Sequence, residues 1–341
     1  MRTVLLLLLV PLAGCLADEH VESPSPPAPA EPAPLELDVR AAVNWWEHIS
    51  TAFPKHDSWT PQNDALRDHL VAELRGLGMD VEVRTYQALP RDPAPVPVDN
   101  PVTEIDAIVA TKQGAWAAAN PDAPEHRMGL VSHYDTQTAT VHGAYDDKSG
   151  VAAEFHICKA LVQMELNRTL ACIFFDAEEQ GLIASARYVE DIQDETDDYV
   201  YDMVLGYDMT GINWPGHDWK MYLMTGPADD VPWLQALGQQ VLHGDLGYPE
   251  SGVEVLDTHD RNSDERRFKE AGVPIYRFAG GRHAADYPQY HMPQDTVEYV
   301  YEFVDGRANF EAGFRTILEG SVHLAFALDG QTLEQLREGT A

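Results

Sequence analysis

Three short apolar segments in the middle of the chain constrain its fold most. Residues 128–132, 170–175 and 203–207 are largely apolar runs of strand length, and segments with helical spacing of apolar residues lie between them. Strands that read as continuous apolar runs are typically buried on both faces, as in parallel sheets covered by helices. The sequence therefore predicts an α/β fold in which a mostly parallel mixed sheet is sandwiched between helices.

The remaining elements follow the same alternation. Apolar periodicity predicts helices over residues 39–53, 63–77, 149–162, 182–189, 231–242, 264–270 and 303–328, the last as one long helix or a broken pair. Further strands are expected over residues 81–86, 105–110, 220–224, 253–256 and 273–278. No internal repeat or second linker interrupts residues 38–330, so we expect one catalytic domain there.

The two ends of the chain lie outside this domain. A short apolar run after a single arginine leads into Leu-Ala-Gly-Cys, which ends at Cys15 and resembles the lipobox of prokaryotic lipoproteins. The resemblance implies that residues 1–15 are a signal segment and that lipid on Cys15 anchors the exported protein at the cell surface; an ordinary secretory signal is the alternative. Residues 16–37, rich in proline, predict an extended tether, and residues 331–341 form a tail.

Charge and cysteine content narrow the possible partners. The formal net charge is -33, with 56 acidic against 23 basic residues spread along the whole chain. Such a surface repels nucleic acid and anionic membranes, and its even spread favours salt adaptation over a preference for cationic substrates. Cys158 and Cys172 lie in apolar runs, one helical and one strand-like. We expect two buried free thiols, although a disulfide between them stays open.

Potential metal ligands occur in separate local motifs. They are His133 in S-H-Y-D, Asp146 in D-D-K-S-G, Glu179 in D-A-E-E-Q-G, Asp208 in Y-D-M-T-G and His291 in Y-H-M-P-Q-D-T. Two histidines and three carboxylates suit zinc, or a pair of zinc ions if one carboxylate bridges. Several of these residues directly follow an expected strand, and ligands bind at the carboxyl ends of strands in such sheets. An adjacent acid, Glu178, supplies the base that metal-assisted hydrolysis requires.

Taken in order, these motifs resemble the M28-type co-catalytic zinc peptidases, over roughly residues 60–325. The resemblance implies a phosphorylase/hydrolase-like α/β sandwich, the fold of zinc exopeptidases. It also implies two zinc ions, although one remains possible. His133 and Asp208 would hold one ion and Glu179 and His291 the other, with Asp146 bridging both.

The resemblance implies roles for further residues. Glu178 would be the general base for a water that bridges the ions, and Asp135 would orient a ligand. Asp295 is a candidate for holding the loop that carries His291.

One motif departs from the family pattern. Where many relatives read S-D-H, this chain reads Ser263-Asp264-Glu265. We expect Asp264 and Glu265 to bind the ammonium group of a substrate. The glycine-containing loop before His291 is expected to form a wall or lid of the substrate pocket, with Arg282 as a substrate contact. Tyr287 and Tyr290 of this loop either line the pocket or simply pack.

The expected activity is that of a zinc-dependent exopeptidase, above all an aminopeptidase acting on peptides. A carboxypeptidase or dipeptidase of the same fold stays open, because arginines near the predicted site offer partners for a carboxylate. A glutaminyl cyclase with one zinc and a non-catalytic surface binding protein are further alternatives. The complete set of five ligands with Glu178 favours the two-metal peptidase. Side-chain specificity, the native metal and the oligomeric state are not decided by the sequence.

Overall fold

The computed structural model describes residues 37–88, 104–194, 198–212, 220–226, 231–257, 263–281 and 284–330. The expected signal segment with Cys15, almost all of the tether, the C-terminal tail and Arg282 lie outside the described residues. Among the described helices, none is both long and apolar enough to span a membrane.

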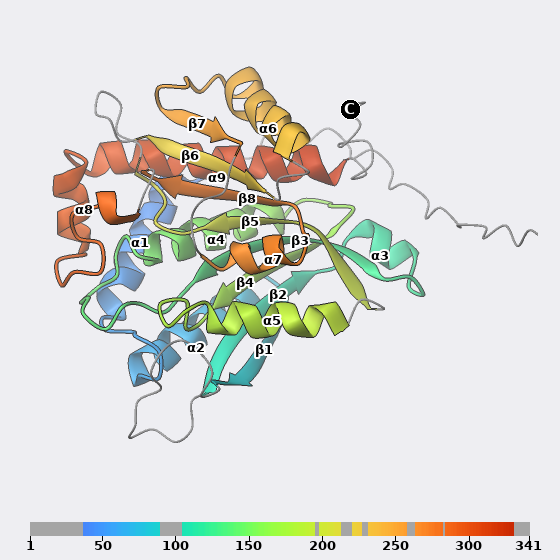
Figure 1. Ribbon diagram of the computed structural model, residues 1–341, viewed down its shortest axis with the longest axis horizontal. Helices are drawn as coiled ribbons and strands as arrows, with labels where there is room; N and C mark the ends of the chain where they lie inside the picture. Colours follow the sequence, from blue (N-terminus) through green and yellow to red (C-terminus); the bar gives the residue numbers. More distant parts are fainter. Residues whose placement is uncertain are drawn as a thin grey trace, which may run out of the picture.

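A mixed sheet forms the centre of the molecule (Figure 1). Its eight strands in the described part of the chain run in the order β1-β2-β4-β3-β5-β8-β6-β7. They are β1 (Asp80–Gln87), β2 (Glu104–Lys112), β3 (Glu125–His133), β4 (Thr169–Phe175), β5 (Tyr199–Tyr207), β6 (Met221–Gly226), β7 (Val253–Leu256) and β8 (Ile275–Gly280). The central strands β4, β3, β5 and β8 are parallel, whereas β2 and β6 pair antiparallel with β4 and β8. The predicted sheet is therefore confirmed.

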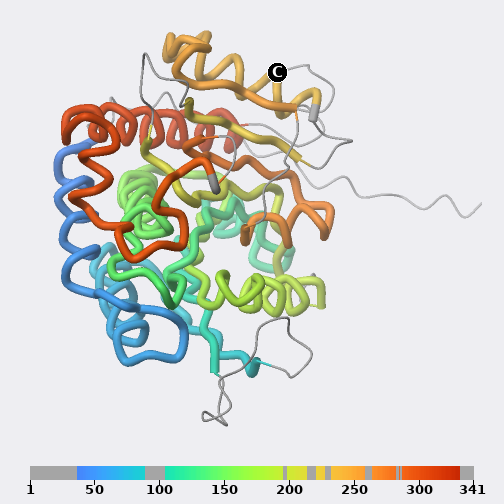
Figure 2. The backbone as a smooth tube through the Cα atoms, turned by 60° about the vertical axis from the view of Figure 1, so that its left-hand side comes forward, coloured from blue at the N-terminus to red at the C-terminus, as the bar shows by residue number. Residues whose placement is uncertain are grey.

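Helices cover both faces of this sheet. The larger core contains residues of α1 (Val39–Ala52), α2 (Pro61–Gly76), α4 (Lys148–Leu161), α6 (Val231–Gln239), α8 (Val297–Phe303) and α9 (Arg307–Asp329). The smaller core, on the opposite face, contains residues of α5 (Ile183–Asp194) and α7 (Glu265–Glu270). Figure 2 shows α1 (blue) beside α9 (red) and apart from α5 (yellow-green).

Strand β4 shows why the central strands are apolar throughout. Cys172 and Phe174 belong to the larger core, whereas Ala171 and Ile173 belong to the smaller one. Successive side chains of a strand point to opposite faces, so a strand covered by helices on both faces needs apolar residues at every position.

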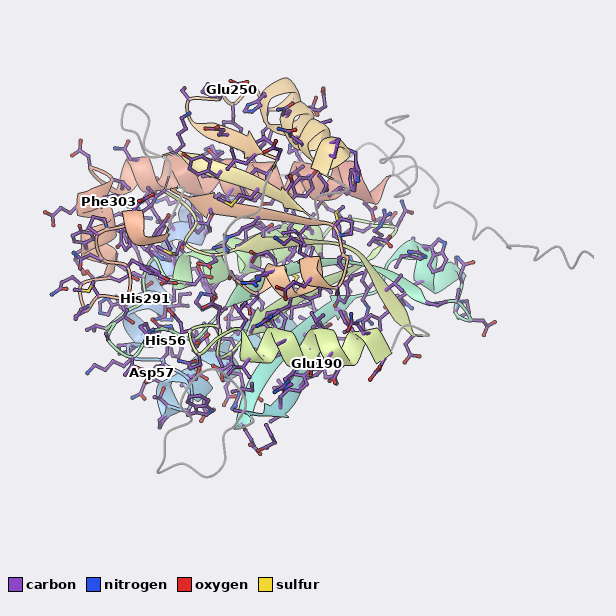
Figure 3. The ribbon with its side chains drawn as sticks, in the orientation of Figure 1. His56, Asp57, Glu190, Glu250, His291 and Phe303 are labelled. Carbon is purple, nitrogen blue, oxygen red and sulfur yellow. A yellow bond between two sulfur atoms is a disulfide. The ribbon has the colours of Figure 1, made fainter. Side chains whose placement is uncertain are left out.

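The helices differ from the sequence-based expectation near the C-terminus and before β3. The segment expected as one long helix or a broken pair over residues 303–328 is one long helix, α9, which begins at Arg307. The helix before it, α8, was not expected; it ends at Phe303 (Figure 3), and Asp305 and Gly306, with positive φ angles of 57° and 115°, separate it from α9. The short helix α3 (Ala115–Ala119) was not expected. Backbone hydrogen bonds from its first residues to the distant carbonyls of Leu166 and Asn167 hold it in place, so local periodicity carries no signal for it.

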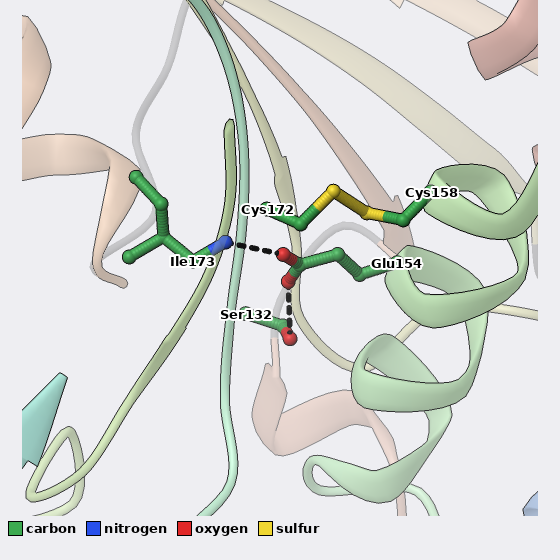
Figure 4. The surroundings of a disulfide bond; sticks show 5 residues. All are labelled: Ser132, Glu154, Cys158, Cys172 and Ile173. Carbon is green, nitrogen blue, oxygen red and sulfur yellow. Dashed lines mark hydrogen bonds between the residues drawn. A yellow bond between two sulfur atoms is a disulfide. The ribbon is translucent and has the colours of Figure 1, made fainter. Parts of the chain in front are cut away.

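The expectation of two free thiols is wrong. Cys158 of α4 and Cys172 of β4 form a disulfide, with Cα atoms 6.4 Å apart (Figure 4). Helical spacing turns Cys158 towards the sheet, and strand alternation turns Cys172 towards the same face. Only the packing of α4 on β4 brings the two sulfur atoms together.

A buried carboxyl group lies beside this disulfide (Figure 4). Glu154 of α4 accepts hydrogen bonds from the backbone N–H of Ile173 at 2.8 Å and from the Ser132 hydroxyl at 2.6 Å. Burial raises the pKa of Glu154 well above its usual value. The helix is thus connected to both β3 and β4 by polar contacts next to its covalent bond.

Candidate metal centre

The predicted metal ligands gather at one edge of the sheet. His133 is the last residue of β3, and Asp208 directly follows β5. Glu179 lies four residues beyond β4, and Asp146 precedes α4. His291 comes from the loop before α8 and lies at the left of Figure 3. The carboxyl ends of parallel strands meet at one edge, which explains why residues far apart in the sequence converge here.

The ligand atoms form two groups. His133, Asp147 and Asp208 make the first group, in which the Nε2 atom of His133 is 4.0 Å from an oxygen of each aspartate. Asp146, Glu179 and His291 make the second group. Its His291 Nε2 atom is 3.0 Å from Glu179 Oε2.

Asp146 lies between the two groups. Its Oδ1 atom is 3.6 Å from His133 Nε2, and its Oδ2 atom is 3.4 Å from His291 Nε2. The peptide bond between Asp146 and Asp147 is cis. Because each oxygen of Asp146 faces a different histidine, this carboxylate has the arrangement that a bridging ligand requires.

Asp147 is a residue that the sequence reasoning missed. Its Oδ1 atom caps α4 by accepting from the N–H of Gly150 at 2.9 Å, and it also accepts from the N–H of Met209 at 2.9 Å. Its Oδ2 atom faces His133. A Cβ atom at position 150 would lie 2.3 Å from this oxygen, so glycine leaves room for it. The sequence feature that could have revealed it is the pair of adjacent aspartates directly before the helix.

The unpaired oxygen atoms of the site test whether it suits a metal. Among the described residues, one buried oxygen each of Asp146, Asp147, Glu179 and Asp208 has no hydrogen-bond donor. A buried carboxylate without a partner is unfavourable, and a cation offsets that cost. With two imidazoles beside them, these oxygens form a mixed set of donors that suits zinc. The residues therefore fit a metal centre.

Comparison with known proteins decides the family. Residues 115–308, more than half of the chain, match the sequence model of peptidase family M28. The chain belongs to peptidase family M28. Membership in this family identifies the chain as a peptidase-like hydrolase.

Individual relatives of this M28 protein are distant. Aminopeptidase YwaD of Bacillus subtilis is 26% identical over 175 residues, which cover 50% of this chain and 36% of that protein. The match thus spans about a third of the relative's length. The structure of BSAP, a zinc aminopeptidase from Bacillus subtilis, has a TM-score of 0.67 at 13% identity and covers 86% of this chain and 96% of that one. Porphyromonas gingivalis glutaminyl cyclase has a TM-score of 0.64 at 19% identity and covers 86% and 99%. At such low identities, these similarities show only that both proteins share the fold of this chain.

Electrostatics in the M28 site favours a bound cation. Burial raises the pKa of Glu178 well above its usual value, and the charges of Glu179 and Asp208 add to this. Burial, followed by the charge of Asp146, raises the pKa of Glu179 to about 7. Burial lowers the pKa of His133, but the charge of Glu178 and hydrogen bonds to nearby carboxylates outweigh it and raise that pKa overall. The carboxyl groups of Glu178 and Glu179 hold their protons more strongly than free carboxyl groups do, and a cation would compete with those protons.

Asp135 connects three functional residues. Its carboxyl group is fully buried and accepts from the backbone N–H groups of Glu178 at 3.0 Å and Glu179 at 3.3 Å. Its Oδ1 atom also lies 3.3 Å from Nδ1 of His133. These contacts fit the orienting role that the resemblance implied, since they fix the imidazole and the turn after β4 together.

Asp295 ties the loop of His291 to the segment of Asp146. Its carboxylate accepts from the backbone N–H groups of Tyr145 and Asp146, each at 3.0 Å, and from the Tyr287 hydroxyl at 3.0 Å. Of the two alternatives for Tyr287, its contacts favour packing. Its side chain is only 1% exposed and serves this internal contact. Tyr290 does lie at the site, where its ring stacks on His291 with centroids 3.7 Å apart.

The expectation that Glu265 binds a substrate ammonium group is also wrong. Glu265 is buried, and its Oε1 atom accepts from Nη1 of Arg277 at 3.0 Å. Its charge is thus satisfied inside the protein, behind Asp208. Asp264 is equally buried, and neither of its carboxyl oxygens accepts a hydrogen bond from the described residues. Burial raises the pKa of Asp264 to about 7. Its role as a substrate contact stays a prediction.

Proposed function

We propose that this protein is a zinc aminopeptidase that uses two metal ions. The observation that carries the proposal is the position of Asp146, with one oxygen towards His133 and the other towards His291. His133 and Asp208 would hold one ion, and Glu179 and His291 the other. When bound, the ions would polarise the scissile carbonyl group and make a water molecule more acidic.

Glu178 is the proposed general base. Asp135 fixes its backbone through the N–H group, and the charge of Glu178 acts directly on His133 in the first group. A carboxylate in this place accepts a proton from the attacking water and returns it to the amine that leaves. The peptide C–N bond breaks as the new C–O bond forms, and the products are a free amino acid and a shortened peptide.

Mass spectrometry on a mixture of short peptides tests the activity. The full chain is incubated with zinc and peptides that have free ends, a blocked N-terminus or a blocked C-terminus, together with peptides that begin with glutamine. Stepwise loss of residues from free N-termini alone is expected. Loss from free C-termini would move the assignment to a carboxypeptidase. Loss of ammonia from glutamine peptides without hydrolysis would identify a glutaminyl cyclase instead, and no change with zinc bound would favour a binding protein.

A further inference from the structure

A buried cation contacts one of the candidate metal ligands. Arg277 lies in β8 and is 1% exposed. Its Nη2 atom donates to Asp208 Oδ2 at 2.6 Å, and its Nη1 atom donates to Glu265 Oε1 at 3.0 Å. The other oxygen of Asp208, Oδ1, accepts no hydrogen bond from the described residues and faces His133. One candidate ligand of the first group, Asp208, therefore already forms an ion pair with an arginine.

The second group lacks such a cation among the described residues. The ion pairs of Asp146 and Glu179 there involve only histidine nitrogens, and no lysine or arginine of the described chain lies within ion-pair distance of them. The two groups thus differ in their electrostatic surroundings although their donors are similar. A guanidinium group next to a ligand repels a dication, and the repulsion is strong because the site is buried.

The pair of Arg277 and Glu265 is built into the surrounding structure. A Cβ atom at Gly206 in β5 would lie 2.7 Å from Glu265 Oε2, so the glycine makes room for this glutamate. Glu265 is also the position at which the sequence departs from the S-D-H pattern. A guanidinium group does not release its proton in proteins, and Arg277 has carboxylate partners on both sides. Arg277 therefore remains charged beside the site.

We propose that Arg277 makes the two metal positions unequal, so that the ion held by His133 and Asp208 binds more weakly than the ion held by Glu179 and His291. The guanidinium group occupies one oxygen of Asp208 and reduces the donor strength of the other. Glu265 limits this effect by neutralising Arg277. Arg277 is thus a positioning residue, and the proposal rests on the two-ion part of the proposed function.

Zinc titration of the metal-stripped full chain, with a competing chelator, tests the proposal. The wild-type protein is expected to show two binding steps of unequal affinity, and His133→Ala should remove the weaker step. The double variant Arg277→Gln/Glu265→Gln keeps amide groups beside Asp208 but removes both charges. It should strengthen the weaker step by roughly 10-fold, because the repulsion between the guanidinium group and the dication is removed, and leave the tighter step unchanged.

Glu265→Gln alone should act in the opposite direction. It leaves Arg277 without its neutralising partner, so the weaker step should become weaker still. Opposite shifts in these two variants are not produced by a general loss of folding. The matched control is Asp202→Asn, which breaks the buried pair of Arg168 and Asp202 at the other end of β5. That pair lies about 20 Å along the strand, and both zinc affinities should stay unchanged.

Two equal zinc steps in the wild-type protein would overturn the proposal, as would a weaker step that the double variant fails to strengthen. If the wild-type protein shows a single step, the double variant must reveal a second one for the proposal to stand. The peptide assay is separate from this titration. Two unequal zinc steps without peptide hydrolysis would reject the aminopeptidase function and leave the inference intact.

Discussion

At the scale of single residues, Glu178 and Glu179 show how adjacent identical side chains acquire different tasks. The Glu179 carboxylate contacts His291 at 3.0 Å and belongs to the second group of donors. Glu178 belongs to neither group, although Asp135 fixes its backbone N–H next to them. The turn after β4 therefore separates one candidate ligand from one candidate base.

The variant Glu178→Gln should retain zinc and lose turnover. An amide has nearly the same shape as a carboxylate but does not accept a proton, so kcat on a peptide substrate should fall roughly 100- to 10,000-fold. Zinc content measured by mass spectrometry should stay at the wild-type level. Glu190→Gln, at the exposed glutamate on α5 labelled in Figure 3, is the matched control and should be fully active. Near-normal kcat in Glu178→Gln would exclude this residue as the base.

At the scale of elements, α4 links the metal centre to the core. Asp147 caps its first turn beside His133. Further along the helix, the Glu154 carboxyl group accepts hydrogen bonds from residues of β3 and β4. Cys158 then joins the helix covalently to β4. The helix that follows Asp146 is therefore attached to the strands that lead to His133 and Glu179.

Removing the disulfide should lower stability without changing the metal centre. The two cysteines are 14 residues apart, and closing a loop of about this length stabilises a protein by about 3 kcal/mol. The variant Cys158→Ala/Cys172→Ala should lose free energy of unfolding of that order in urea titrations. Wild-type protein treated with a reductant should show a similar loss. If reduced and oxidised wild-type proteins unfold at the same urea concentration, the bond contributes nothing to stability.

At the scale of the whole molecule, acidic residues outnumber basic ones, and several of them are buried. The net charge is -33, and self-repulsion at such a charge opposes the compact state. Burial also raises the pKa values of Glu179, Asp264 and Asp295 to about 7 each. Unfolded carboxyl groups titrate near pH 4, so the folded, metal-free protein holds protons that the unfolded chain has already released.

The metal-free protein should therefore lose stability as the pH rises. The contribution of these raised pKa values is fully present below about pH 4 and is lost as the pH passes through about 7. Thermal unfolding in a chelator should give a higher midpoint at pH 5 than at pH 8. Bound zinc replaces the protons of its ligands, so added zinc should raise the midpoint much more at pH 8 than at pH 5. A metal-free protein that is more stable at pH 8 would contradict this explanation.

The sequence by itself determined the order of the strands along the chain, most of the helices between them, and the edge at which the site lies. Alternation in strands and helical spacing are local patterns, which is why β4 and its neighbours were recognisable from their own residues. His133 ends its strand and Asp208 directly follows its own, so a parallel sheet was sufficient to predict that they converge.

The tertiary structure alone decided which side chains meet. It brings Asp147 to His133, joins Cys158 to Cys172, and turns Glu265 towards Arg277 rather than towards substrate. Each of these contacts depends on distances of a few ångströms between segments that are separate in the chain. Local periodicity sets the face on which a side chain lies, whereas packing between elements sets its partner on that face.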